Sequence, residues 1–130
     1  MRSGFTIVEL LIVMVIIGLL AAIAIPKFAN TKERATLTAM KSDLRNLVTV
    51  EEGHFVENLS YTTDPGSAYS VTSGNKMPTI TITPDGWSAV ITSWNSAQVC
   101  AVYMGSTAAP PAVKEGSPAC GDGAAITTAP

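Results

Sequence analysis

Hydrophobic and polar residues follow three different patterns along this chain of 130 residues. From Phe5 to Ile25 the chain is almost continuously apolar, since 18 of these 21 positions carry apolar side chains. Over residues 27–57 apolar residues recur every three or four positions, and after Asn58 short β-rich runs are separated by polar stretches. The first two patterns predict helix, and the third predicts short strands.

The apolar segment has the length of a membrane-spanning helix. At about 1.5 Å per residue, 21 helical residues cover roughly 31 Å, the thickness of the hydrocarbon core of a bilayer. A helix that is apolar on all sides has no solvent face in a small soluble domain, so we expect this one to lie in a membrane. A cleaved secretory signal is the alternative, because Ala22–Ala24 has a small-x-small pattern. The run is longer than the usual signal core, however, and it contains a carboxylate.

Glu9 is the one charged residue within the apolar segment. A carboxylate in lipid costs on the order of 2.5–3.5 kcal/mol, so Glu9 requires a partner or a function. Cleavage after Gly4 would create one such partner, the α-amine of Phe5, which in one straight helix lies roughly 6 Å from Glu9 along the axis. The same pair formed between neighbouring chains would fix the axial stagger of one helix against the next.

Residues 27–57 are expected to continue this helix outside the membrane and to end it near Glu57. They hold ten charges, five of each sign, and Asp43 is expected on a different face from the apolar residues. One apolar stripe runs along the segment and consists of Leu37, Met40, Leu44 and Leu47. The single histidine, His54, is expected to be an ordinary surface residue rather than a metal ligand, because no cysteine or second histidine accompanies it.

Residues 58–130 predict a loop-rich antiparallel β domain. Ser, Thr, Gly and Pro supply 33 of these 73 residues, which is typical of short strands joined by long loops. The expected strands are Thr79–Thr83, Trp87–Trp94 and Val99–Met104. A tight turn at Pro84–Gly86 is expected to join the first two. We therefore expect an α+β fold in which three or four strands pack by one face on the helical stripe.

The two cysteines fall in this β domain. Cys100 lies in an expected strand and Cys120 in a glycine-rich tail, with 19 residues between them. Two cysteines outside the membrane permit one disulfide in an oxidising compartment, and closing a loop of this length stabilises the fold by roughly 3 kcal/mol. A redox-active pair is the alternative, but the spacing is not CxxC, so a structural disulfide is favoured.

Signatures of catalysis are missing from the sequence. A phosphate-binding loop, a nucleophile elbow and an HExxH pattern are absent, so we expect no catalytic residue, no metal site and no cofactor. Asp64, Asp85 and Asp122 stand beside glycine or proline and are expected to serve turns, and Asn58–Ser60 matches a glycosylation sequon.

Composition excludes further classes. The apolar content of 47% excludes a disordered chain, and the formal net charge of −2 argues against a nucleic-acid partner. The charged fraction of 14% is well below the roughly 25% of soluble proteins, which agrees with membrane residence.

The N-terminal sequence GFTIVE at residues 4–9, followed by the apolar helix and by AIPKF at residues 24–28, resembles the N-terminus of type IV pilins and related pseudopilins. The likeness covers about 25 residues closely. It is specific, because a glycine, an aromatic residue and a glutamate stand at fixed places ahead of a membrane-length helix. Ile7-Val8 is a mild departure from the Leu-Ile more usual there, and the leader 1–4 is shorter and less basic than most.

The resemblance implies how the chain is processed. A prepilin peptidase would remove the leader 1–4 between Gly4 and Phe5, and the new amine of Phe5 would be N-methylated. Glu9 would then guide assembly by pairing with the Phe5 amine of a neighbour. The stretch from Gly18 to Pro26 would lose helical hydrogen bonds in the filament, in agreement with the helix-weakening character of both residues.

The resemblance also implies a life cycle and a function. Residues 5–26 would anchor the subunit in the inner membrane until the pilus assembly machinery transfers it into a helical homopolymer outside the cell. The chain would then be a structural subunit, most simply the major pilin, with residues 27–57 continuing into a globular head. The loop between Cys100 and Cys120 resembles in position the disulfide-closed C-terminal loop of many pilins.

Two other functions are consistent with parts of the sequence. A pseudopilin of a type II secretion or DNA-uptake machine would share the N-terminal segment, although the cysteine loop and the Ser/Thr-rich exterior favour a surface filament. A membrane-anchored binding protein would use the helix only as a tether, would need no cleavage after Gly4 and would tolerate the loss of Glu9.

Overall fold

The structure, a computed structural model, describes residues 3–123. Its elements, in chain order, are α1 (Ile7–Asn58), the 3-10 turn η1 (Gly66–Ala68), β1 (Thr79–Thr83), β2 (Gly86–Ser93), β3 (Ser96–Met104) and β4 (Ala119–Asp122). The chain divides into two compact units, Met1–Glu33 and Arg34–Pro130, and α1 contributes to both. We call them the N-terminal unit and the globular unit and describe each by itself.

The N-terminal unit consists of the first part of α1 and the residues before it. The helix begins at Ile7, two residues later than expected, and continues through Gly18 and Pro26. Its large apolar side chains are exposed, and the helix is long and apolar enough to cross a membrane. Residues 1 and 2 of the expected leader lie outside the described range.

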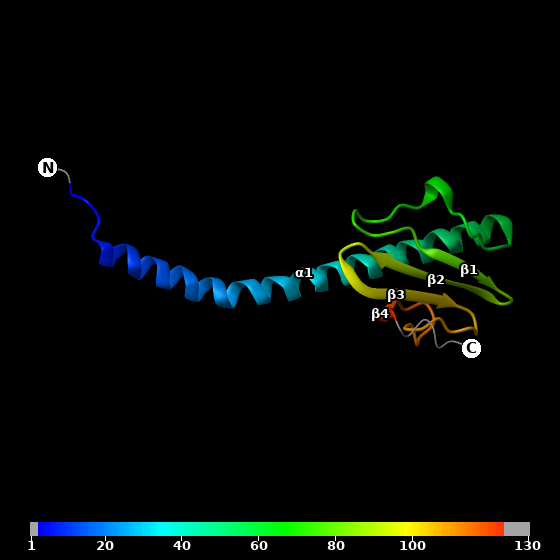
Figure 1. The fold of residues 1–130 in the computed structure, drawn as a ribbon. Helices are drawn as coiled ribbons and strands as arrows, with labels where there is room; N and C mark the ends of the chain where they lie inside the picture. Colours follow the sequence, from blue (N-terminus) through cyan, green and yellow to red (C-terminus); the bar gives the residue numbers. More distant parts are fainter. Residues whose placement is uncertain (1–2, 124–130) are drawn as a thin grey trace. The chain divides into compact units, whose positions relative to one another are not determined.

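The globular unit contains one antiparallel sheet with the strand order β1-β2-β3-β4, and the last part of α1 lies along one of its faces (Figure 1). The expected turn joins β1 to β2, since Thr83 pairs with Gly86. A Cβ atom on Gly86 would overlap the carbonyl oxygen of Met104, so only glycine allows β2 and β3 to approach here. The α+β architecture and the strand count of three or four are confirmed.

The predicted helical stripe forms the core between helix and sheet. Met40, Leu44 and Leu47 are completely buried, and Leu37 packs against them. Their partners on the sheet alternate along two strands and include Trp87, Ala89, Ile91, Cys100 and Val102. This alternation is the period of two that places every second strand residue on one face.

The opposite face of the sheet is covered by the segment between β3 and β4, which the sequence analysis did not foresee. Ala101 and Tyr103 point away from the helix and pack with Ala112 of this segment. Strand β4 was also missed, because Cys120 was expected in an irregular tail. Its sequence, ACGD, has low strand propensity, and it is held by pairing with β3 rather than by its own preference.

Candidate assembly site

The start of α1 is closed by a reciprocal cap between Thr6 and Glu9. The backbone N–H of Glu9 donates to Thr6 Oγ1 over 3.2 Å, and the backbone N–H of Thr6 donates to Glu9 Oε2 over 2.8 Å. The Thr6 hydroxyl also donates to Glu9 Oε2 over 2.9 Å. This is a capping box, which satisfies backbone donors that the first helical turn leaves free.

The capping box changes the interpretation of Glu9. Only a cationic partner was expected for Glu9, but its partner is Thr6, three residues before it. The pattern T-x-x-E ahead of an apolar run is the usual signature of this motif. Both bonds from Thr6 end on Oε2, and within the described residues no hydrogen bond is found at Oε1. Glu9 therefore caps its own helix through one carboxylate oxygen.

Gly4 and Phe5, the expected cleavage position, lie ahead of the helix in a segment without regular secondary structure, and both are exposed. The side chain of Phe5 is 84% exposed, and a Cβ atom on Gly4 would meet nothing within 4 Å. Nothing in the described chain therefore requires glycine at position 4. The same holds for Gly18, whose added Cβ would also meet no neighbour.

A buried carboxylate in the globular unit ties α1 to the loop that leads to the sheet. Asp43 is 3% exposed, and its carboxylate accepts three hydrogen bonds, from Thr72 N (3.0 Å), Thr72 Oγ1 (2.8 Å) and Asn75 Nδ2 (2.7 Å). The hydroxyl of Tyr69 donates to the backbone carbonyl of Asp43 over 3.0 Å. The expectation that Asp43 lies on a different face from the apolar stripe was wrong. It follows Met40 by three residues and precedes Leu47 by four, which places it at the edge of the stripe, where the loop folds over it.

A second acidic residue, Glu51, is completely buried near the end of α1. Its Oε2 accepts a hydrogen bond from the backbone N–H of Thr62 over 3.0 Å, while Oε1 is buried without a partner. Burial raises the pKa of the Glu51 carboxyl, and the bond from Thr62 opposes that rise only in part. Sequence reasoning missed Glu51 because a helical glutamate is normally solvated.

Cys100 and Cys120 form a disulfide, as predicted. They are direct partners in the register of β3 and β4, so the bond closes the segment that covers the outer face of the sheet. Cys100 is completely buried beside the helical stripe. The disulfide therefore has a structural position in the core of the globular unit.

The remaining polar candidates serve local structure. His54 Nδ1 lies 2.7 Å from the carbonyl oxygen of Ser60, and Asp64 accepts the backbone N–H of Gly66 over 3.0 Å, a turn contact of the expected kind. Asp85 accepts the backbone N–H of Ser106 over 2.7 Å, and the hydroxyl and backbone N–H of Ser106 lower the pKa of this carboxyl. Within residues 3–123 we find no cluster of three or more His, Cys, Asp or Glu side chains that could hold a metal ion.

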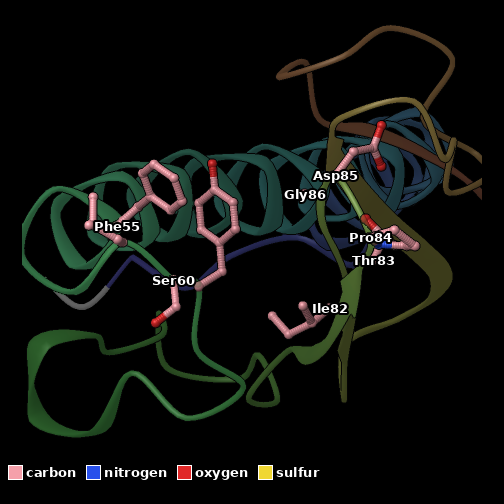
Figure 2. A pocket seen from close by; sticks show the side chains of 9 residues that line it. Phe55, Ser60, Ile82, Thr83, Pro84, Asp85 and Gly86 are labelled. Atoms are coloured by element: carbon pink, nitrogen blue, oxygen red, sulfur yellow. The ribbon is translucent and has the colours of Figure 1, made fainter.

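A hollow of about 390 Å³ lies where α1 ends and β1 turns into β2. Figure 2 shows Phe55 and Ser60 on one side of it and Ile82 and Pro84–Gly86 on the other. Tyr61 also lines it, and the rings of Phe55 and Tyr61 stack with their centroids 4.7 Å apart. We call this site the distal hollow.

These features define a class of protein: a membrane-length apolar helix with a carboxylate-capped start, continued by a helix that is buried on a small antiparallel sheet. Residues 1–25 match the family model described as the prokaryotic N-terminal methylation motif. Over 105 residues the chain is 36% identical to the type IV wide pilus major component PilA4 of Thermus thermophilus, which covers 81% of this chain and 76% of that protein. The chain therefore belongs to the type IV pilin family.

Two further relatives show how far the likeness extends. The chain is 44% identical over 60 residues to the type IV major pilin protein PilA of Myxococcus xanthus, covering 46% of this chain and 27% of the relative. It is 29% identical over 86 residues to the type II secretion system core protein G of Pseudomonas aeruginosa, covering 66% of this chain and 58% of the relative. The chain thus spans less than two thirds of the length of both of these relatives.

Proposed function

We propose that this chain is the precursor of a type IV pilin and serves as the major structural subunit of an extracellular filament. The observation that carries the proposal is the capped, exposed N-terminus ahead of a membrane-length apolar helix. Relatives named as major pilus subunits support it. The role is structural rather than enzymatic, with other copies of the chain as the main partner.

Processing would occur between Gly4 and Phe5, by a prepilin peptidase, followed by N-methylation of the Phe5 amine. The capping box survives this cut, because its first residue, Thr6, lies after the cleavage position. The new amine carries a positive charge close to the start of a helix, where the helix dipole is also positive. A carboxylate is needed to offset both charges, and Glu9 supplies it.

Glu9 can serve its own helix and a neighbour at the same time. Oε2 holds Thr6, and Oε1 is available to accept the Phe5 amine of an adjacent subunit. Such a pair in an apolar surrounding favours one axial register over all others, because any other register leaves a charge without a partner. The apolar helix lies first in the inner membrane and then against other helices in the filament, so it is covered in both states.

The register role is tested with filament yield. The full chain is expressed in a bacterium that carries type IV pilus machinery but lacks its own major pilin, and sheared surface material is quantified. We expect Glu9→Leu and Glu9→Gln to abolish filaments, whereas Thr6→Val, which removes only the cap, reduces the yield in part. Glu33→Leu, at an exposed position outside the apolar segment, is the control. Normal filament yield from Glu9→Leu would refute the role of Glu9.

Mass spectrometry of the mature N-terminus tests processing separately. N-methyl-phenylalanine at position 5 supports the pilin proposal, and an intact N-terminus instead supports a membrane-anchored binding protein. A pseudopilin is the second candidate, favoured by the likeness to the secretion-system core protein. Long filaments of this polypeptide in sheared surface material support the pilin, whereas processed chain that stays with the cell envelope supports the pseudopilin.

A further inference from the structure

Trp94 is a large apolar side chain displayed on the surface of the globular unit. It is 77% exposed in the turn between β2 and β3, and Lys76 Nζ lies 3.8 Å from the centroid of its ring. The turn is held firmly, because the backbone N–H of Trp94 donates to Gly74 O over 2.9 Å and the hydroxyl of Ser93 donates to the same oxygen over 2.8 Å. We call Trp94 with Lys76 the tryptophan knob.

The knob has the character of a binding hot spot. Tryptophan is among the side chains most enriched at hot spots, and an ordered turn loses little conformational freedom when it binds. Asn75, next to Lys76, also donates to the buried carboxylate of Asp43 over 2.7 Å, which links the knob to the rigid core. An exposed indole on a turn held by these hydrogen bonds can insert into a preformed apolar hollow without reordering the turn.

The distal hollow has the size and the lining to accept such a side chain. Its volume of about 390 Å³ exceeds the roughly 150 Å³ that holds a benzene molecule in a protein cavity. Its apolar lining remains partly open to solvent, with Phe55, Leu59 and Ile82 exposed by 36%, 80% and 43%. The hollow therefore offers aromatic and aliphatic surface that no part of residues 34–123 covers.

The charges around the hollow are of the opposite sign to the knob. Asp85 lines the hollow. The hydroxyl of Tyr61, another lining residue, donates a hydrogen bond to Glu52 Oε1 over 3.3 Å. Burial raises the pKa of Tyr61, and the negative charges of Glu52, Glu51 and Glu115 raise it further. We call Asp85 and Glu52 the acidic rim of the hollow; the knob, by contrast, carries the ammonium group of Lys76.

Knob and hollow cannot meet within one globular unit. Gly86, which lines the hollow, begins β2, and Trp94 directly follows the last residue of β2. The two are therefore eight positions apart along an extended strand, roughly 26 Å. Figure 1 shows the β1–β2 turn and the β2–β3 turn at opposite ends of the sheet. A contact between two different surfaces of one chain is head-to-tail, and it gives an open polymer when the rotation between copies does not close a ring.

We propose that the tryptophan knob of one copy of this chain inserts into the distal hollow of another copy, with Lys76 facing the acidic rim. The contact rests on the proposed filament function and adds a specific junction between globular units to the packing of the apolar helices. A single tryptophan buries only about 150–250 Å², well below a complete interface, so the junction reinforces the filament rather than holding it alone.

The first test compares side-chain accessibility in filaments and in monomers. Hydroxyl-radical footprinting of wild-type filaments, and of the same full chain in detergent micelles, measures oxidation of Trp94 and Phe55 by mass spectrometry. We expect both residues to be oxidised at least about tenfold less in filaments. Equal oxidation of Trp94 in the two samples would overturn the proposal and leave the knob available for a ligand outside the filament.

The second test uses variants of the knob with matched controls. Trp94→Ala and Lys76→Glu should each lower filament yield at least about tenfold, as expected for a hot spot. Val113→Ala and Lys114→Glu make the same kinds of change at exposed positions elsewhere and should leave the yield within about twofold. Combining Lys76→Glu with Asp85→Lys should restore part of the lost yield.

The outcomes separate this junction from the proposed function. Wild-type yield from Trp94→Ala, with normal filaments throughout, refutes the junction and leaves the pilin proposal intact. Absence of any filament from the wild-type chain refutes the pilin proposal and the junction with it. Thermal unfolding and N-terminal processing of each variant are measured alongside, so that loss of filaments is assigned to assembly rather than to folding.

Discussion

The buried carboxylate of Asp43 should contribute more to the stability of the globular unit than any other single polar side chain we describe. Asp43 is 3% exposed and its carboxylate accepts three hydrogen bonds from Thr72 and Asn75, and within residues 3–123 no ion pair is found that would offset its burial. A buried charge is tolerated only when hydrogen bonds replace its hydration, so removing the acceptor should be costly.

The two substitutions Asp43→Ala and Asp43→Asn separate the loss of the hydrogen-bond acceptor from the loss of the negative charge. Alanine leaves the Thr72 N–H and the Asn75 amide without an acceptor, and each unsatisfied donor costs about 1–3 kcal/mol, so we expect a loss of about 3–5 kcal/mol. Asparagine keeps one oxygen for Thr72 N and Asn75 Nδ2, and the Thr72 hydroxyl can rotate to accept from its amide. Only the additional strength of hydrogen bonds to a charged acceptor is then lost, and we expect the free energy of unfolding to fall by about 1–2 kcal/mol.

The free energy of unfolding is measured on the full chain in detergent micelles, with the disulfide intact and tryptophan fluorescence as the signal. At about 4–8 °C per kcal/mol for a unit of this size, Asp43→Asn should lower the unfolding midpoint by roughly 10 °C, and Asp43→Ala by at least twice as much.

The matched control is Asp122, which is exposed at the end of β4. Asp122→Asn and Asp122→Ala should change the free energy of unfolding by less than about 0.5 kcal/mol. If Asp43→Ala unfolds at the wild-type temperature, or is more stable than Asp43→Asn, the hydrogen bonds do not stabilise the unit and the reasoning is refuted.

Two more predictions concern the same unit. Burial raises the pKa of Glu51 above its ordinary value of 4.5, so the carboxyl binds a proton more tightly in the folded protein than in the unfolded protein. The contribution of Glu51 to stability therefore falls as the pH rises through and above that value. Glu51→Gln should therefore raise the unfolding midpoint at pH 7 and have little benefit at pH 4, and a larger gain at pH 4 would contradict this sign. Reduction of the disulfide between Cys100 and Cys120 should cost about 3 kcal/mol and lower the midpoint by roughly 15 °C, whereas an unchanged midpoint after complete reduction would show that the bond does not constrain the fold.

Several features of the fold could be predicted from local sequence because their causes are local. The uninterrupted apolar run, the helical spacing of Leu37, Met40, Leu44 and Leu47, and the alternation in Thr79–Thr83 each specify an element and the face it buries. The turn at Pro84–Gly86 could also be predicted from sequence, since proline and glycine favour its backbone geometry.

The candidate site was only partly predictable. Glu9 was found because a charge in an apolar run is conspicuous. Its bond to Thr6 was not predicted, because a carboxylate in lipid was expected to require a cationic partner. Asp43 and Glu51 gave no sign of burial, since an acidic residue on an amphipathic helix is normally solvated. The distal hollow and the tryptophan knob involve residues from separate elements, so no local pattern could show them.

The sequence by itself determined the elements whose period and length act over a few residues: the membrane-length helix, its amphipathic continuation, the first three strands and the cysteine pair. Only the tertiary structure decided which polar groups are buried, that ACGD becomes the fourth strand, and that the segment between Cys100 and Cys120 covers the outer face of the sheet. The physical reason is that these outcomes depend on pairing between residues about 20–30 positions apart, where a partner across space outweighs the local preference of either residue.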